Sequence, residues 1–264
     1  SLLNEVRLRR KMIEIQNVTR LYGKTVAVSK LDLHIYRGEI FGLLGSNGAG
    51  KSTTMKMVCG LLKPTKGTIH VGGIDVRNNP LAVKAKIGYL PENAQLYDRL
   101  TGKENLEMIG ALRKLSSSLI EERIEYYSEK LGLENYIFSE VGSYSKGMKQ
   151  RLAIAQTLIH DPEVLVLDEP ASGLDPRYVK LLKEWIKKLA GAGCTIILST
   201  HITEIAESLC DRIGIINNGR LGGIGTVSDL MIATNSKNLE DCFVNIVESD
   251  STTEITEGRF YRTD

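Results

Sequence analysis

Hydrophobic and polar residues alternate in short runs along about the first 90 residues of the chain, and this two-residue period predicts β-strands. Two alternating runs, 12–18 and 26–35, are joined through a turn at Tyr22-Gly-Lys. The apolar run 39–44 predicts a further strand, and 67–76 predicts a hairpin or meander. A short strand is expected at 86–90, where Pro91 ends it.

The period changes to that of a helix between about Thr101 and Asp161. Apolar residues spaced by three or four positions are predicted to share two helix faces, one of Met108, Leu112 and Leu115 and one of Ile120, Ile124, Tyr127 and Leu131. A long helical stretch between strands favours a helical subdomain inserted at about 92–160.

Strand and helix patterns alternate again after this stretch, with strands expected at 164–167, 194–199 and 212–216 and helices at about 176–190 and 204–209. Such alternation implies right-handed crossovers and a parallel sheet. Asn217-Asn-Gly219 predicts a tight turn, and the segment 236–264 is polar and weakly patterned, as in a C-terminal tail. The predicted fold class is α/β, with a mainly parallel sheet, an N-terminal antiparallel β subdomain and inserted helices.

Composition narrows the class of protein without naming a function. A chain of 264 residues with 42% hydrophobic and 25% charged residues is ordinary for one folded α/β domain. The net charge of +2 comes from interspersed residues, so nucleic acid is not expected as a partner. The four cysteines are scattered, which supports neither a disulfide framework nor a zinc site.

Hydropathy along the chain predicts no membrane-spanning segment, because no run of about 18 apolar residues occurs. Residues 1–11 are basic and precede the first strand pattern at Met12. They are interpreted as a leader or a passive N-terminal extension, and a surface that binds a membrane or a partner is the alternative.

Residues 45–53, Gly-Ser-Asn-Gly-Ala-Gly-Lys-Ser-Thr, lie between the strand pattern 39–44 and a helical pattern, and they match the phosphate-binding loop G-x-x-x-x-G-K-[ST]. Glycines permit backbone angles that aim N–H groups at a polyphosphate, and the helix N-terminus favours the same anion. Lys51 is predicted to bind the β- and γ-phosphates, and the Ser52 hydroxyl to bind Mg²⁺. The residues expected to contact the nucleotide are Ser46, Asn47, Gly48, Ala49, Gly50, Lys51, Ser52 and Thr53.

The predicted strand 164–167 ends in two adjacent carboxylates, Asp168 and Glu169. Ends of parallel strands face the ligand crevice, so Asp168 is expected to hold Mg²⁺ through a water. Glu169 is expected to orient or deprotonate the water that attacks the γ-phosphate. Before this strand, Ser145 is a good N-cap for an amphipathic helix, and the first turn of that helix predicts a second anion site.

From about Ile13 to Ile224 the chain resembles the nucleotide-binding subunit of ATP-binding cassette (ABC) transporters. The resemblance rests on the order and spacing of the phosphate loop, the Tyr144–Met148 signature, Asp168-Glu169, Ser172-Gly-Leu-Asp175 and Ser199-Thr-His201. It implies a P-loop NTPase core, an ABC ATPase domain over 12–235, and ATP with Mg²⁺ as cofactors. It also implies residue roles: Tyr22 would stack on adenine, Asp175 would lie in the loop that couples two ATP sites, and His201 would contact the γ-phosphate.

Two positions depart from the family pattern. Glu92 follows Tyr89-Leu-Pro91 where Gln is usual, and its carboxylate is expected to offer an oxygen to Mg²⁺ or to the attacking water while adding negative charge. Lys146 and Met148 stand where the signature usually has Gly and Gln, and Lys146 is expected to add a cation near a partner's γ-phosphate. Both departures resemble a subgroup that serves exporters of drugs, ions or polysaccharides.

The resemblance implies that two cassettes, identical or related, pair head-to-tail, so that each ATP lies between the phosphate loop of one and Ser145, Lys146 and Gly147 of the other. Catalysis is assigned to Glu169, His201 and Lys51, and Mg²⁺ binding to Ser52, Glu92 and Asp168. A separate integral membrane permease would be the transport partner, which places this subunit in the cytoplasm at the inner face of the cell membrane. The expected function is ATP-driven transport, with export favoured.

Three other functions were compared with this one. Soluble ABC ATPases that act on ribosomes or DNA usually carry two cassettes or long coiled-coil insertions, and neither is present in this sequence. A P-loop kinase or GTPase would not need the Ser145 helix, and the guanine motif N-K-x-D does not occur. A regulatory cassette that does not hydrolyse ATP is disfavoured by Glu169 and His201.

Overall fold

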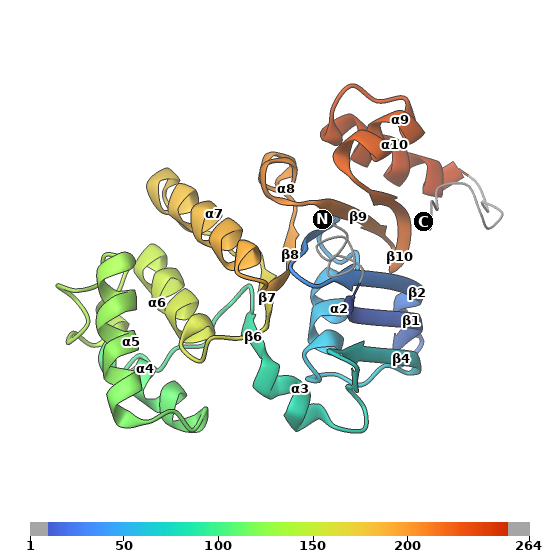
Figure 1. The fold of residues 1–264 in the computed structure, drawn as a ribbon. Coiled ribbons are helices and arrows are strands. Elements are labelled where there is room, and N and C mark those ends of the chain that lie inside the picture. Colours follow the sequence, from blue (N-terminus) through green and yellow to red (C-terminus); the bar gives the residue numbers. More distant parts are fainter. Residues whose placement is uncertain (1–9, 253–264) are drawn as a thin grey trace, which may run out of the picture.

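The computed structural model describes residues 10–252, and Figure 1 shows two sheets with a separate group of helices to one side. The smaller sheet is antiparallel, in the order β2-β1-β4-β5. Its strands are β1 (Lys11–Tyr22), β2 (Thr25–Tyr36), β4 (Lys66–Val71) and β5 (Ile74–Asp75). The predicted N-terminal antiparallel subdomain is therefore confirmed, including the hairpin turn after Tyr22.

The larger sheet contains six strands in the order β10-β9-β3-β8-β7-β6, and only the pairing of β10 with β9 is antiparallel. The strands are β3 (Ile40–Leu44), β6 (Ile87–Leu90), β7 (Val164–Asp168), β8 (Thr195–Thr200), β9 (Arg212–Asn217) and β10 (Arg220–Gly225). Every residue of β3, β7 and β8 is buried, as expected for parallel strands covered on both faces. This arrangement confirms the mainly parallel sheet.

Helices of the core flank this sheet, and the inserted helices stand apart from it (Figure 1). The core helices are α2 (Lys51–Val58), α3 (Pro80–Lys86), α7 (Pro176–Gly191) and α8 (Thr203–Leu209). The inserted group contains α4 (Gly102–Leu112), α5 (Ser117–Lys130), the 3₁₀ turn η1 (Val141–Ser143) and α6 (Lys146–Leu158). The short helix α3, opened by Asn79 as N-cap and Pro80, was not predicted from the sequence.

Alternating residues of the buried strands enter two different hydrophobic cores. Leu165 and Leu167 of β7 pack in the core that α5, α6 and α7 cover, whereas Val164 and Val166 pack with α2 and the antiparallel sheet. Asp168 is two residues after Val166 and therefore lies on the same side of the sheet, the side covered by α2. The two-residue period of the strand thus places the Asp168 carboxylate, and not that of Glu169, on the face that the phosphate loop and α2 share.

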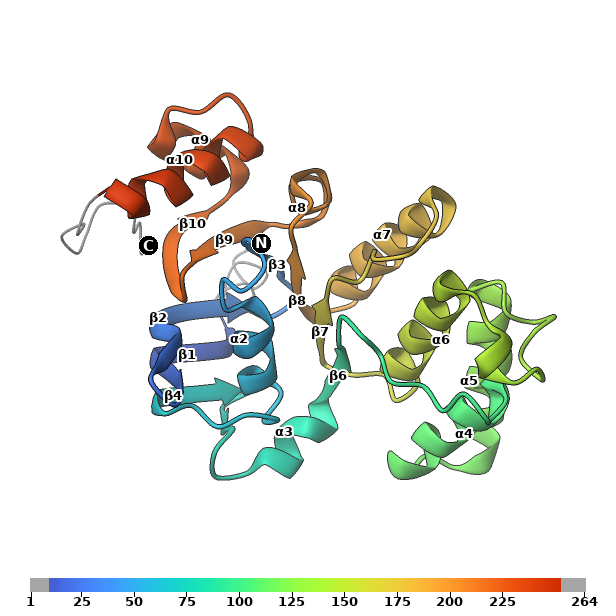
Figure 2. The ribbon, with the colours of Figure 1, turned by 180° about the vertical axis from the view of Figure 1, so that it is seen from behind.

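The chain beyond Asn235 differs from the weakly patterned tail that was predicted. Helix α9 (Val227–Thr234) is followed by α10 (Leu239–Thr252), and both lie against β9 and β10 (Figure 2). Leu239, Cys242 and Ile246 are buried and recur on one face of α10, where they pack on β9. These helices close a third hydrophobic core, and they replace the predicted tail as far as residue 252.

The two predicted helix faces in the insertion have different outcomes. Ile120, Ile124, Tyr127 and Leu131 are all buried, so that face is confirmed. The face of Met108, Leu112 and Leu115 is wrong: Leu112 is 72% exposed, and α4 instead buries Asn105, Leu106 and Gly110.

Three smaller predictions concern the cysteines, the bilayer and the N-terminus. All four cysteines are free thiols, and the three that are buried pack as small apolar side chains. In the described part of the chain no helix is both long and apolar enough to cross a bilayer. The basic extension predicted at 1–11 falls almost entirely outside the described residues.

Candidate functional site

The phosphate loop connects β3 to α2, and its backbone has the conformation that its glycines were predicted to allow. Gly48 and Gly50 have φ angles of 82° and 109°, which side-chain-bearing residues rarely adopt. A Cβ on Gly50 would lie only 2.7 Å from the Ala27 carbonyl oxygen of β2. Gly219, in the β9–β10 turn, donates its N–H to the Ala49 carbonyl at 2.9 Å and so braces the loop. These contacts with β2 and with the β9–β10 turn therefore support the open curve of the loop.

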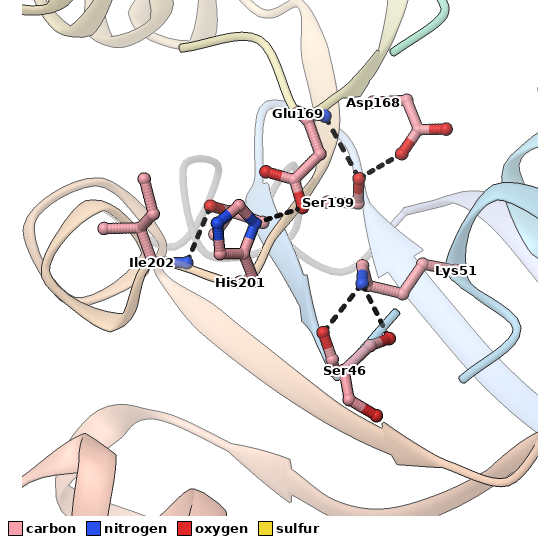
Figure 3. A network of polar contacts seen from close by, with 9 residues as sticks. Ser46, Lys51, Asp168, Glu169, Ser199, His201 and Ile202 are labelled. Carbon is pink, nitrogen blue, oxygen red and sulfur yellow. Dashed lines mark hydrogen bonds and ion pairs between the residues drawn. The ribbon is translucent and has the colours of Figure 1, made fainter. Parts of the chain in front are cut away.

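Lys51 is the first residue of α2, and its side chain folds back over the loop. Its Nζ donates to the carbonyl oxygens of Gly45 at 2.7 Å and Ser46 at 3.0 Å (Figure 3). Burial lowers the pKa of Lys51, and the nearby carboxylates Glu169, Asp168 and Glu92 oppose this shift. The ammonium group is thus held beside the place where an anion can bind.

A cleft of about 300 Å³ opens beside this loop, within the size range of small-molecule sites. It is lined by Ala27, Asn47, Gly48, Gly50, Lys51, Ser52, Thr53, Glu92, Asp168 and Glu169. Nine of these ten were sequence-predicted site residues, and they come from segments far apart in the chain. Ser46 and Ala49, also predicted, belong to the loop but do not line the cleft.

The two carboxylates are fixed by the neighbouring strand β8. Asp168 pairs in register with Ser199, whose hydroxyl donates a short hydrogen bond to Asp168 Oδ1. The Glu169 N–H lies 3.2 Å from both the carbonyl oxygen and the Oγ of Ser199. Glu169 itself has a φ of 49°, which turns the chain sharply after the strand and sends its side chain away from that of Asp168 (Figure 3).

His201 follows β8 by one residue, and its Nδ1 donates to Glu169 Oε1 at 2.9 Å (Figure 3). The His201 side chain is 60% exposed, whereas that of Glu169 is only 9% exposed. The imidazole is therefore open to the surface while it orients a nearly buried carboxylate. A buried carboxylate held by a histidine can accept a proton from a water in the cleft.

The residues predicted to bind a second nucleotide lie elsewhere. Ser145 caps α6 and accepts a hydrogen bond from the Met148 N–H at 3.2 Å, as predicted. Asp175 caps α7 by accepting from the N–H groups of Arg177 and Tyr178. Lys146 and Gly147 pack against Gly173, between these two caps. Ser145, Lys146, Gly147 and Asp175 form a group separate from the lining of the cleft.

Tyr22 is the last residue of β1 and lies at the hairpin turn. Tyr22 is 47% exposed, and the Arg20 guanidinium carbon lies 4.7 Å from the centroid of its ring. Its strand partner is Thr25, two residues before the cleft residue Ala27. Tyr22 thus lies outside the lining of the cleft, on the strand that pairs with the one carrying Ala27.

Sequence reasoning assigned no role to three residues that shape the site. Ser199 was noted in a motif, but its contacts with Asp168 and Glu169 depend on the pairing of β7 and β8. Ala27 and Gly219 meet the phosphate loop through the antiparallel hairpins at either side. Residues that meet across strands but lie far apart in the chain leave no pattern in the local sequence. Of these features, only the Asn-Gly turn at 218–219 was predicted from the sequence.

A glycine loop between a parallel strand and a helix, with acidic residues at the end of a nearby strand, defines a P-loop nucleoside triphosphatase. A family model described as "ABC transporter" matches residues 28–172. The chain belongs to the ABC transporter family, as an ATP-binding subunit that hydrolyses ATP to drive transport.

Known proteins resemble the chain over most of its length. The ABC transporter ATP-binding protein NatA of Bacillus subtilis is 40% identical over 220 residues, which cover 83% of this chain and 89% of that relative. The bacitracin transport ATP-binding protein BcrA of Enterococcus faecalis is 36% identical over 96% of this chain and 80% of its own length. A solved ATP-binding subunit of an ABC transporter has a TM-score of 0.84 at 32% identity and covers 89% of this chain and 99% of its own.

A second solved structure records a relative with hydrolysis products. A dimeric ATP-binding cassette in a post-hydrolysis state, bound to ADP and Pi, has a TM-score of 0.76 at 26% identity. The match covers 81% of this chain and 98% of that one. Dimeric cassettes therefore occur among the relatives of this fold.

Proposed function

We propose that this chain works as a head-to-tail pair with a second copy of itself or with a related cassette, so that ATP is held between the cleft of one and the α6 N-terminus of the other. The separation of the two residue groups carries this proposal. One phosphate-binding group lines the cleft, and Ser145, Lys146 and Gly147 lie outside it on α6. A second molecule can bring that helix N-terminus to the nucleotide.

Residues of the cleft divide the work of hydrolysis. The loop N–H groups and Lys51 hold the β- and γ-phosphates, because both supply positive charge in a shaped cradle. Glu169 accepts the proton of the attacking water, and His201 orients Glu169 and contacts the γ-phosphate. Tyr22 stacks on the adenine at the margin of the cleft. Asp175 couples the two sites from the cap of α7.

Mg²⁺ arrives with ATP as part of the substrate, and the donors in the cleft fit it. Ser52, Glu92 and Asp168 supply hydroxyl and carboxylate oxygens, the hard ligands that Mg²⁺ prefers together with phosphate oxygens and water. When bound, the ion neutralises charge on the phosphates. Ser199 fixes one oxygen of Asp168, which leaves the other free to face the ion or its water.

ATP would drive pairing by a shift of population. Both faces contact ATP, whereas ADP lacks the γ-phosphate, so the closed pair is favoured only by ATP and opens after hydrolysis. Lys146 is exposed at the α6 N-terminus and would add a cation near the partner's γ-phosphate. The inserted helices, connected to the cleft through Glu92, would pass the movement to a permease.

The transport partner is proposed to be a separate integral membrane permease, with this subunit at its cytoplasmic side. Export is the favoured direction, because two relatives are named "Nod factor export ATP-binding protein I" and "Linearmycin resistance ATP-binding protein LnrL". Purification of the tagged chain from membranes tests this: a co-purifying polytopic membrane protein is expected. Recovery of the full-length chain only from the soluble fraction, with no such protein, would contradict the proposed partner.

The variant Glu169→Gln tests pairing and catalysis together. The amide keeps the size of the side chain but cannot take up a proton, so we expect turnover to stop and an ATP-bound dimer to accumulate. Light scattering after size exclusion in saturating MgATP, together with phosphate release, measures both. The control is Glu163→Gln, at a surface carboxylate that pairs with Lys86 away from the cleft.

Two results would refute separate parts of the proposal. A Glu169→Gln variant that releases phosphate at the parental rate removes Glu169 as the base. A catalytically dead variant that stays monomeric in saturating MgATP removes the shared nucleotide site.

A further inference from the structure

Arg20 covers one face of the exposed Tyr22 ring, and this contact has no counterpart in the motifs that define the family site. Arg20 and Tyr22 are two residues apart on β1, and their side chains meet although the pairing of β1 with β2 shifts register between Arg20 and Leu21. The guanidinium carbon is 4.7 Å from the ring centroid, within the range of a cation–π interaction. Because Tyr22 is 47% exposed, part of its side chain is open to a planar ligand as well.

The same guanidinium is anchored to the segment that follows α2. Arg20 Nη1 donates to the Lys63 carbonyl oxygen at 2.8 Å. Next to it, the Leu21 N–H donates to Thr65 Oγ1 at 3.0 Å, so the end of β1 is attached twice to this segment. Helix α2 begins at the phosphate loop and leads into the segment after four residues, which places both in one continuous piece of chain.

We propose that Arg20 is a positioning residue for the base of the nucleotide: it holds the Tyr22 ring at a fixed place relative to the phosphate loop. This inference rests on the proposed stacking of adenine on Tyr22. Arg20 does not touch the nucleotide itself. Its charge also draws electron density toward one face of the ring, which favours stacking of an electron-rich purine on the other face.

Arg20 should therefore affect the recognition of adenosine and leave the recognition of phosphate unchanged. A cation–π contact at an exposed site contributes enough to change an affinity by about two- to fivefold. We expect Arg20→Ala to weaken binding of ATP by this factor and to leave binding of inorganic tripolyphosphate unaltered. Both affinities are measured by calorimetry on the full chain without Mg²⁺, so that no hydrolysis occurs.

Two further variants separate positioning from general support of the fold. Arg20→Gln keeps a polar side chain with an N–H donor but removes the cation, so ATP binding should weaken while the thermal midpoint stays near that of the parent. Arg77 is the matched control, because it is a second arginine anchored to the same segment: its Nη2 donates to the carbonyl oxygens of Pro64 and Gly67, both at 3.3 Å. Arg77→Ala should leave the ATP-to-tripolyphosphate affinity ratio unchanged.

A double-mutant cycle completes the test. In a Tyr22→Ala background, Arg20→Ala should have no further effect on ATP binding, because its effect passes through the ring. Equal weakening for ATP and tripolyphosphate, or an undiminished effect without Tyr22, would overturn the positioning role. If Tyr22→Ala leaves ATP affinity unchanged, base stacking on Tyr22 fails and the inference about Arg20 with it. If the parent binds neither ligand, the proposed nucleotide site itself is wrong.

Discussion

Removal of the Ser199 hydroxyl should destabilise the protein and slow hydrolysis at the same time. Ser199 is fully buried in β8, where its Oγ donates to Asp168 Oδ1 and accepts from the Glu169 N–H. Hydrogen bonds to charged groups contribute about 1.5–3 kcal/mol. In Ser199→Ala the Glu169 N–H keeps the Ser199 carbonyl as a partner at 3.2 Å, so the main loss falls on the buried Asp168 carboxylate.

We therefore expect the free energy of unfolding of Ser199→Ala to fall by about 2 kcal/mol in urea titrations. We expect kcat for ATP hydrolysis to fall by roughly 10- to 100-fold, because the Asp168 carboxylate loses its fixed position and the Glu169 N–H loses one of its two acceptors. KM for ATP should change little, since the phosphate loop is untouched. Phosphate release at varied MgATP measures both constants.

Thr157→Val is the control for this prediction. The buried Thr157 hydroxyl donates to the neutral Ala153 carbonyl at 2.8 Å within α6, so its removal should cost less than about 1.5 kcal/mol and leave kcat unchanged. If Ser199→Ala has the stability and the kcat of the parent, the hydrogen bonds of Ser199 do not hold the two carboxylates in place.

Two predictions concern buried polar groups outside the cleft. Tyr89→Phe should raise the free energy of unfolding by about 1 kcal/mol, because the buried Tyr89 hydroxyl finds no hydrogen-bond partner within residues 10–252; lower stability in urea would show that the hydroxyl is satisfied. Burial, with a smaller effect of Arg113, lowers the pKa of His160 to about 4, against 6.5 for the free side chain. Between pH 6.5 and 4 the unfolded chain binds one proton more than the folded protein, so the free energy of unfolding should fall as the pH is lowered through this range. His160→Gln should reduce this dependence on pH, and equal slopes in variant and parent would exclude His160 as the cause.

The parts of the site that lie within one short segment were predictable from the sequence. The geometry of the phosphate loop depends on the spacing of its glycines, on the strand before it and on the helix after it. All three lie within a segment of about 20 residues, so the loop could be recognised from local sequence alone. The N-cap role of Ser145 was predictable for the same local reason and is confirmed, whereas the N-cap role of Asp175 in α7 was not predicted. Contacts across the sheet were not predictable, because the register of β7 with β8 is set by packing of the whole core.

The one helix face that was predicted wrongly shows a limit of apolar periodicity. In α4 the buried positions include Asn105, whose amide nitrogen donates to the Tyr97 and Thr101 carbonyls. They also include Gly110, where a Cβ would lie 2.6 Å from Ile120 of α5. A count of apolar side chains cannot detect a buried polar residue that hydrogen-bonds to a loop, or a glycine that lets a neighbouring helix approach closely. The apolar spacing indicated the face that contains Leu112, but close packing buries a different face of α4.

The contacts of α6 connect the two halves of the proposed shared site within one molecule. The buried Gln150 side chain donates to the Pro170 carbonyl at 3.1 Å, one residue beyond Glu169. Four residues earlier on α6, the Lys146 side chain lies over Gly173, where a Cβ would be only 3.0 Å from it. A shift of the turn after β7 must therefore move the α6 N-terminus or break a buried hydrogen bond. Loss of the γ-phosphate beside Glu169 in one cleft would thus change the helix end that this chain presents to its partner's nucleotide.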